Sequence, residues 1–177
     1  DILATVNVNG AANLTLTGTG STAITTVNAA DMTGKLTLDI SASNANTNAV
    51  TGGTGADTID IGAVTSTDTV DGGAGEDTLT IAAAVTVANA AGVTNVETLS
   101  IVGAGGTVSQ DMDAFAATTI SLGGNSNNVI TLTDLSATQN TLSLVASNSE
   151  STTGTSAARK VDSLADAMTV NIGAAAA

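Results

Sequence analysis

Residues 48–81 read Asn48-Ala-Val-Thr-Gly-Gly-Thr-Gly-Ala-Asp57-Thr-Ile-Asp-Ile61 and, after six further residues, Asp68-Thr-Val-Asp71-Gly-Gly-Ala-Gly-Glu-Asp77-Thr-Leu-Thr-Ile81. In both segments a glycine-rich turn precedes a short run in which aliphatic and polar residues alternate. Glycine permits tight turns and close approach of the backbone, and alternation places Ile59 and Ile61 on one face of a strand. The stretch therefore predicts two turns, each followed by a short, half-buried strand.

Four oxygen-bearing side chains recur in phase along this stretch. Asp57 and Asp77 precede equivalent strands, and the interval between them equals the interval between Asn48 and Asp68. If one coil of a solenoid takes about 20 residues, Asp57 lies over Asp77 on one edge and Asn48 over Asp68 on the other. Stacked strands lie about 4.8 Å apart and Ca²⁺ binds oxygen at about 2.3–2.6 Å, so one ion fits between two stacked carboxylates. A hard, oxygen-only site of this kind suits Ca²⁺ better than Zn²⁺.

The charge pattern agrees with a cation site. Six of the 16 acidic residues fall between residues 57 and 77, and that range holds no Lys or Arg. Two unit charges at this separation repel by about 1 kcal/mol in water and by more at a protein edge. The alternatives are a flexible linker or a solvated acidic face, and the regular spacing favours calcium binding over both.

Two copies of the pattern Gly-Gly-x-Gly-x-Asp-x-U-x, with U aliphatic, lie at residues 52–60 and 72–80. This resembles the calcium-binding repeat of repeat-in-toxin (RTX) proteins. Residues 26–38 and 92–101 also resemble segments of bacterial surface-layer proteins and large surface adhesins. The resemblance and the spacing together give a predicted set of metal-site residues: Asn48, Gly52, Gly53, Thr54, Gly55, Asp57, Asp68, Gly72, Gly73, Ala74, Gly75 and Asp77.

The strand pattern continues beyond the glycine turns at a nearly constant period. Glu97-Thr-Leu-Ser-Ile101 repeats Asp77-Thr-Leu-Thr-Ile81, and Thr118-Thr-Ile-Ser-Leu122 follows at nearly the same interval. This predicts two inward columns, one of Ile59, Leu79, Leu99 and Ile120 and one of Ile61, Ile81, Ile101 and Leu122. The expected fold is all-β, a parallel β-solenoid (β-helix or β-roll) with about 20 residues per coil. A β-sandwich of independent strands is the alternative.

The pattern breaks near residue 148. Met112 and Phe115 suggest a helical turn before that point. Apolar residues at helical spacing within residues 156–168 predict a short helix, and Thr169-Val-Asn-Ile172 predicts a closing strand. We therefore expect a solenoid over residues 1–147, followed by a loop, helix and strand over residues 148–177 that form a cap or contact a neighbouring subunit. The chain reads as a piece of a longer protein.

The composition excludes several functions. The chain has no Cys, His, Trp, Tyr or Pro, and its net charge of −13 disfavours nucleic acid and anionic membranes as partners. The sequence contains no apolar run long enough to predict a membrane span. Without His or Cys, acid–base catalysis at neutral pH would fall to a shifted carboxylate or Lys, so we do not expect an enzyme.

The resemblance implies a structural protein of the bacterial cell surface. It would be exported unfolded by a type I route, fold outside in calcium, and form a surface-layer lattice with copies of itself, with cell-surface polysaccharide as a further candidate partner. One alternative is a repeat module of a large adhesin that contacts ice or carbohydrate through its Thr-x-Thr runs. An unbroken Thr column would support that module, whereas the irregular spacing of the strands before Val50 counts against it. Another alternative is the secretion and folding domain of an extracellular enzyme.

Overall fold

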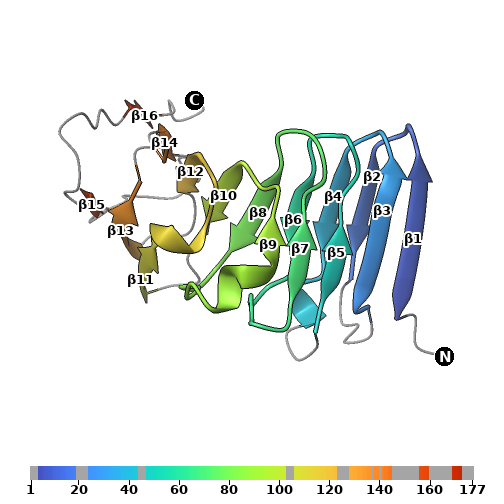
Figure 1. The fold of residues 1–177 in the computed structure, drawn as a ribbon, viewed down its shortest axis with the longest axis horizontal. Coiled ribbons are helices and arrows are strands. Elements are labelled where there is room, and N and C mark those ends of the chain that lie inside the picture. Colours follow the sequence, from blue (N-terminus) through green and yellow to red (C-terminus); the bar gives the residue numbers. More distant parts are fainter. Residues whose placement is uncertain are drawn as a thin grey trace.

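The computed structural model describes residues 4–18, 24–43, 47–102, 106–122, 128–136, 138–139, 141–144, 156–159 and 169–172. Their strands form three parallel sheets, and the chain passes alternately from one side of the solenoid to the other (Figure 1). The eight-stranded sheet follows the order β16-β14-β12-β10-β8-β6-β4-β2. On the other side lie a five-stranded sheet, β1-β3-β5-β7-β9, and a three-stranded sheet, β11-β13-β15.

The eight-stranded sheet consists of β2 (Leu14–Thr17), β4 (Leu36–Asp39), β6 (Thr58–Asp60), β8 (Thr78–Ile81), β10 (Thr98–Ile101), β12 (Thr119–Leu122), β14 (Thr141–Leu144) and β16 (Thr169–Ile172). The five-stranded sheet consists of β1 (Thr5–Gly10), β3 (Thr26–Met32), β5 (Ala49–Thr51), β7 (Thr69–Asp71) and β9 (Val93–Thr94). The three-stranded sheet consists of β11 (Gly106–Asp111), β13 (Asn128–Leu135) and β15 (Ser156–Arg159). Three 3₁₀ turns complete the described elements: η1 (Ser41–Ser43), η2 (Asn89–Gly92) and η3 (Met112–Ala114).

The register confirms the predicted coil length. Thr58 pairs with Thr78 and Thr78 with Thr98, so a coil here takes about 20 residues, as in other solenoids with short coils. Thr119 pairs with Thr98 in the same register, and this coil is longer by a single residue. The fold is therefore an all-β parallel β-solenoid. The sandwich alternative is wrong, because strands adjacent in space are about one coil apart in sequence rather than hairpin partners.

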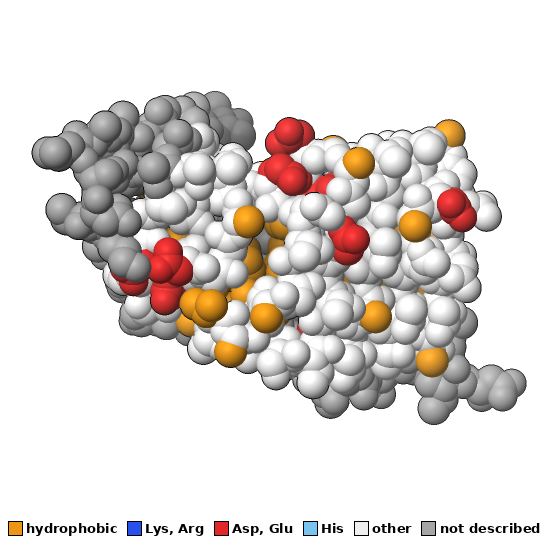
Figure 2. All heavy atoms as spheres, in the orientation of Figure 1, with side chains coloured by type: hydrophobic (Ala, Val, Ile, Leu, Met, Phe, Trp, Pro, Cys, Tyr) orange, Lys and Arg blue, Asp and Glu red, His pale blue; other side chains and the backbone are white. Residues whose placement is uncertain are grey.

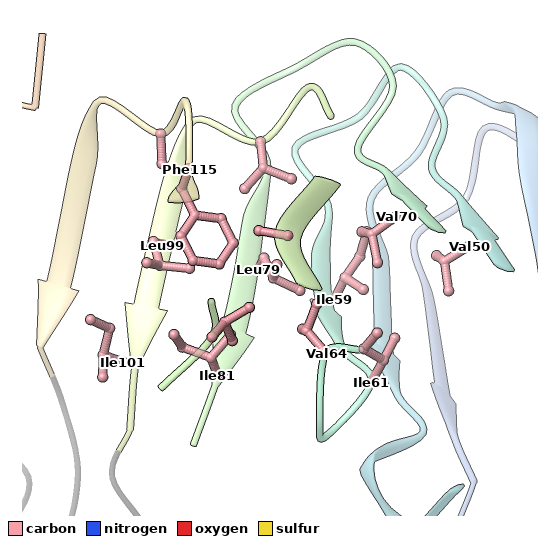
Figure 3. Close-up of a cluster of buried hydrophobic side chains, with 14 of the residues drawn as sticks. Val50, Ile59, Ile61, Val64, Val70, Leu79, Ile81, Leu99, Ile101 and Phe115 are labelled. Carbon is pink, nitrogen blue, oxygen red and sulfur yellow. The ribbon is translucent and has the colours of Figure 1, made fainter. Parts of the chain in front are cut away.

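The core lies between the sheets and is built from aliphatic ladders (Figure 3). The predicted columns are confirmed. Ile59, Leu79, Leu99 and Ile120 are fully buried and occupy one register position. Ile61, Ile81, Ile101 and Leu122 are buried beside them. Burying such a side chain stabilises the fold by about 1.5–3 kcal/mol, so stacked coils can form a core without aromatic residues.

One side of the solenoid is interrupted after β9. This strand has two residues and is followed by Asn95, whose φ is 51°. The three-stranded sheet then begins with β11, while β10 and β12 keep the opposite sheet continuous. The buried Gln110 side chain on β11 bridges the interruption, because it accepts a hydrogen bond from Val85 N and donates one to Val85 O, each at 2.8 Å. A buried amide thus replaces strand pairing at this point.

The C-terminal part differs from the prediction of a helical cap. Residues 156–159 form β15, which pairs with β13, and β16 pairs with β14, so both strands extend the sheets. The predicted helix is wrong for residues 156–159, because pairing with the open edge of β13 supplies backbone hydrogen bonds there, and residues 160–168 lie outside the described part. The helical turn expected near Met112 and Phe115 is present as η3. Within the described residues, none of the elements is an α-helix and no helix has the length and hydropathy to cross a membrane.

Candidate metal centre at the glycine turns

The four in-phase side chains lie in two stacks, as the spacing predicted. Asp57 and Asp77 directly precede β6 and β8, and Asn48 and Asp68 precede β5 and β7, respectively. All four side chains are buried, with exposed fractions of 1% for Asn48 and Asp57, 2% for Asp68 and 0% for Asp77. The solenoid corners therefore bury three carboxylates, which require compensation by hydrogen bonds, protons or cations.

Backbone N–H groups compensate the burial of the Asp57 carboxylate. Its Oδ1 accepts a hydrogen bond from Leu36 N at 2.7 Å, and its Oδ2 accepts one from Gly53 N at 2.8 Å. The first bond comes from the preceding coil and the second from the glycine turn of its own coil. Asp57 thus ties its turn to the preceding coil through two short hydrogen bonds to its carboxylate.

Asp68 plays the same part at the opposite edge. Its Oδ1 accepts a hydrogen bond from Asn48 N at 2.7 Å, while its Oδ2 accepts bonds from Thr65 N at 2.7 Å and Thr65 Oγ1 at 2.8 Å. Asn48 and Asp68 are therefore joined directly across the coils. This geometry provides a hydrogen-bonded link where the sequence suggested a shared ion.

Asp77 differs from the other two carboxylates. Its Oδ1 accepts a hydrogen bond from Asp57 N at 2.7 Å, which continues the ladder. Its Oδ2 is buried and has no hydrogen-bond partner in the described part of the chain. In the next coil, Glu97 Oε2 accepts a hydrogen bond from Asp77 N at 2.8 Å. One oxygen of the stack is therefore left for a proton, a water molecule or a cation.

The two turns differ in sequence and in backbone conformation, since φ is +94° at Gly73 and is not positive at the equivalent Gly53. In the first turn Gly53 N donates to Asp57, but in the second turn the equivalent Gly73 N donates to Asp71 Oδ1 at 3.0 Å. Asp71 pairs in register with Thr51, which has no carboxylate to compete for that N–H group. The carboxylate at residue 71 thus accepts from the N–H group whose equivalent in the first turn donates to Asp57.

The glycines of the turns are required by the stacking of the coils. A Cβ atom at Gly52 would overlap the carbonyl oxygen of Gly72, and one at Gly73 would overlap that of Gly53. The carbonyl of Gly53 also accepts a hydrogen bond from Ala74 N at 2.9 Å. The turns therefore pack backbone against backbone, which is the close approach that the sequence predicted for these glycines.

Burial and neighbouring charge act on the acidic groups here. Burial, followed by the negative charges of Asp57, Glu97 and Glu76, raises the pKa of Asp77 to about 6, against the opposing effect of the hydrogen bond from Asp57 N. Burial also raises the pKa of Asp60 on the outer face of β6, with a smaller contribution from the in-register Asp39. Acidic side chains stand in separate groups on the face shown in Figure 2. The corner at Asp77 is thus deficient in positive charge.

Among the buried carboxylates of the described chain, Asp77 alone has an oxygen without a hydrogen bond, so the stack offers a cation one such oxygen rather than a row of them. Within the described ranges, no group of three acidic side chains is placed to hold a metal ion. Asp57 and Asp68 already use both oxygens for hydrogen bonds. Asp77 Oδ2 is the buried oxygen that a cation would satisfy, and backbone carbonyls would have to supply most of the remaining ligands.

The structure brings together the predicted residues of each turn but gives them different roles. Gly52, Gly53, Thr54 and Gly55 stack on Gly72, Gly73, Ala74 and Gly75 in the next coil, and Asp57 stacks on Asp77. Sequence reasoning missed Glu97 as the next member of the stack, although the interval from Asp77 to Glu97 equals that from Asp57 to Asp77 and carried the signal. It also missed Thr65, which lies between the glycine repeats at residues 52–60 and 72–80, where no repeat pattern indicates a role.

No family model, curated protein or solved structure matches this chain. The parallel β-solenoid is thus established from its own geometry, and any closer relationship belongs to the proposal that follows.

Proposed function

We propose that this chain is a calcium-stabilised structural segment of a bacterial cell-surface protein. The observation that carries the proposal is the buried, unpartnered Oδ2 atom of Asp77 within a stack of acidic side chains in the described part of the chain. Asp57, Asp77 and Glu97 follow one another along this corner, and each links its own coil to the coil before it. A divalent cation bound at Asp77 neutralises this stack and supplies the missing partner.

The unpartnered oxygen of Asp77 can be satisfied by a proton, a water molecule or a cation. A proton can satisfy the carboxyl group, but a pKa of about 6 means that most of the group is ionised above pH 7. A buried, ionised carboxylate with one unsatisfied oxygen destabilises the fold. Calcium accepts six to eight oxygen ligands in flexible geometry, including backbone carbonyls, so it suits a turn with few side-chain ligands.

The wider role follows from the fold together with the RTX resemblance. A solenoid grows by adding coils, so it provides length and a regular surface with few sequence requirements. Calcium dependence would keep the acidic chain unfolded during type I export and stabilise it outside the cell, where calcium is abundant. In this proposal the segment contributes to a surface-layer lattice of identical copies, with surface polysaccharide as a candidate anchor.

Thermal unfolding in the presence and absence of calcium tests the proposal. Far-UV circular dichroism is recorded in millimolar CaCl₂, in the same concentration of MgCl₂, and after chelation. We expect the unfolding temperature to rise in calcium and to rise much less in magnesium, which demands stricter octahedral geometry. Sedimentation in the same buffers then measures whether copies of the chain associate.

The matched variants are Asp77→Asn and Asp31→Asn. Asp77→Asn keeps the acceptor for Asp57 N but removes the buried charge, so it should lose most of the calcium response. Asp31 is exposed on β3, so Asp31→Asn changes the net charge equally and should keep the response. The proposal would be contradicted if calcium did not change the unfolding temperature of the wild-type chain. It would also be contradicted if both variants lost the calcium response equally.

A further inference from the structure

The outer face of the eight-stranded sheet carries an unbroken column of threonines. Each strand from β2 to β14 contributes one Thr at the same register position, and the column consists of Thr15, Thr37, Thr58, Thr78, Thr98, Thr119 and Thr141. In β16 the same register position is held by Thr169. The irregular spacing near the N-terminus does not disturb the column, because Thr37 pairs with Thr15 and with Thr58 although the segments between them differ in length. The extra residues lie between the strands.

A second column runs beside the first, two residues further along each strand. Over β8, β10, β12 and β14 both columns consist of hydroxyl residues, and we call these eight residues the hydroxyl face: Thr78, Thr80, Thr98, Ser100, Thr119, Ser121, Thr141 and Ser143. The strands pair here without a register shift. Neighbouring hydroxyl residues are therefore spaced by about 4.8 Å between strands and by about 6.7 Å along each strand.

Most hydroxyls of this face are available to an outside partner. In the described part of the chain, the side-chain hydroxyls of Thr78, Thr98 and Thr119 make no hydrogen bond to a protein group, and the same is true of Thr80, Ser100, Ser121 and Ser143. Hydroxyls at the corners behave differently, since Thr47 donates to Thr67 and Ser136 bonds with Thr138. Side chains of the hydroxyl face are partly buried. The β-branched Thr members have restricted χ1 rotation, so their hydroxyl and methyl groups have few alternative positions.

Solvation of a β-sheet alone does not require this arrangement. The neighbouring column varies among Thr, Asp, Ser and Asn, all of which keep the surface polar, whereas the first column holds Thr on every strand. On the opposite side, the equivalent outward position of β5 is Ala49, between Thr26 and Thr69. Thr5 pairs with Thr26 on that side, so the difference between the two sides is that the column on the eight-stranded sheet is not interrupted.

The hydroxyl face is suited to a partner that is periodic and uncharged. None of the eight residues of the hydroxyl face is charged, and Asp60 borders the face on the neighbouring strand β6. An open sheet surface lacks the cavity that holds a soluble small molecule. It also lacks the aromatic and Arg residues that anchor protein partners, and the one aromatic residue of the chain, Phe115, is buried in the core. Without an aromatic platform a sugar polymer has little to stack on. Water ordered in a crystal offers repeated hydroxyl donors and acceptors and no charge.

We propose that the hydroxyl face binds the surface of ice. The fixed hydroxyls hydrogen-bond to lattice water, while the Thr methyl groups between them exclude disordered water. This inference is independent of calcium binding at Asp77, which lies buried at a corner, because the array is set by the strand register alone.

The test measures thermal hysteresis and ice-crystal shape with the full chain in millimolar calcium. We compare the wild-type chain with Thr98→Tyr/Thr119→Tyr, which places two bulky rings at the centre of the face, and with Thr69→Tyr, which changes an exposed Thr on β7. Tyr is well tolerated in strands, and circular dichroism confirms that each variant folds. We expect hysteresis and faceted crystals for the wild type and Thr69→Tyr, and loss of both for the double variant.

Two results would overturn the proposal. One is a wild-type chain that gives no more hysteresis than an equal concentration of serum albumin. The other is a Thr69→Tyr control that loses as much thermal hysteresis as the double variant. Cosedimentation with microcrystalline cellulose and chitin forms a separate arm, and binding there that the double variant loses, without any effect on ice, would assign the face to a polysaccharide instead.

Discussion

At the scale of single residues, the corner carboxylates act first as acceptors for backbone N–H groups. Asp57 and Asp68 satisfy both oxygens in this way, and Asp77 satisfies one. Spacing predicted that these side chains would stack, and they do. It did not predict their partners. The same spacing suits an ion shared by two carboxylates and a carboxylate that accepts a hydrogen bond from the backbone of the preceding coil.

Asp71→Thr tests the explanation for the unpartnered oxygen. The substitution copies Thr51 from the preceding coil and frees Gly73 N to donate to Asp77 Oδ2, as Gly53 N donates to Asp57. The substitution also removes the exposed hydrogen bond that Asn95 Nδ2 donates to Asp71 Oδ1, which contributes less than a buried one. We expect the calcium-free protein at pH 7 to gain about 1 kcal/mol of unfolding free energy, measured by urea denaturation. Asp31→Asn removes one exposed charge as a control, and an equal gain there would point to net charge instead.

The raised pKa of Asp77 predicts a pH dependence for the calcium-free protein. A carboxyl group with a pKa of about 6 in the folded state and 3.8 as the reference binds more protons when folded between those values. Its contribution to stability is therefore present below pH 4 and is lost as the pH rises to 6, at about 1.4 kcal/mol per pKa unit. Urea denaturation of wild type and Asp77→Asn from pH 4 to 7 isolates it, and a constant difference between the two would contradict the assignment.

At the scale of elements, the glycine turns and the strands follow from different signals. The alternation in Thr58-Ile-Asp60 and Thr78-Leu-Thr-Ile81 predicted β6 and β8 with their buried faces. The helix predicted from apolar spacing was wrong at residues 156–159, because a local pattern does not report that an open strand edge on β13 is within reach. The side chain of Gln110 hydrogen-bonds to the backbone of Val85, and that of Gln139 to the carbonyls of Met112 and Phe115. Neither glutamine belongs to a repeat, so no sequence pattern indicated these bonds.

Gly53→Ala should destabilise the turn through steric overlap. The new methyl group would meet the carbonyl oxygen of Met32 in the preceding coil, and relieving such a clash costs about 1–3 kcal/mol. Ala74→Ser changes an exposed position of the second turn and serves as the control. Thermal unfolding measures both, and a Gly53→Ala variant as stable as the control would show that the coils are less tightly stacked.

At the scale of the whole molecule, stability depends on contact between successive coils. The regular period carried by Leu79, Leu99 and Ile120 predicted the solenoid. It did not predict that one side would divide after β9 while the eight-stranded sheet continues, since the break arises from a two-residue strand and a bridging Gln110. The unbroken Thr column likewise emerges only when the register is known.

The loss of stability caused by a core substitution should depend on the position of the residue along the solenoid. Leu79 is fully buried between Ile59 and Leu99, whereas Leu16 on β2 is partly exposed at the end of its sheet. We expect Leu79→Ala to cost about 2–5 kcal/mol and Leu16→Ala less, measured by urea denaturation. Equal costs would contradict a core in which each coil is supported mainly by its two neighbours.

The most direct test of the calcium proposal is the titration of the Asp77 carboxyl group by ¹³C NMR, with and without calcium. Without calcium, we predict that its resonance titrates with a pKa of about 6, because the carboxylate is buried beside other acids. In millimolar calcium, we predict that the group stays ionised to a clearly lower pH, because a cation bound to Oδ2 favours the charged form. A titration that calcium leaves unchanged would contradict the assignment of Asp77 as a calcium ligand.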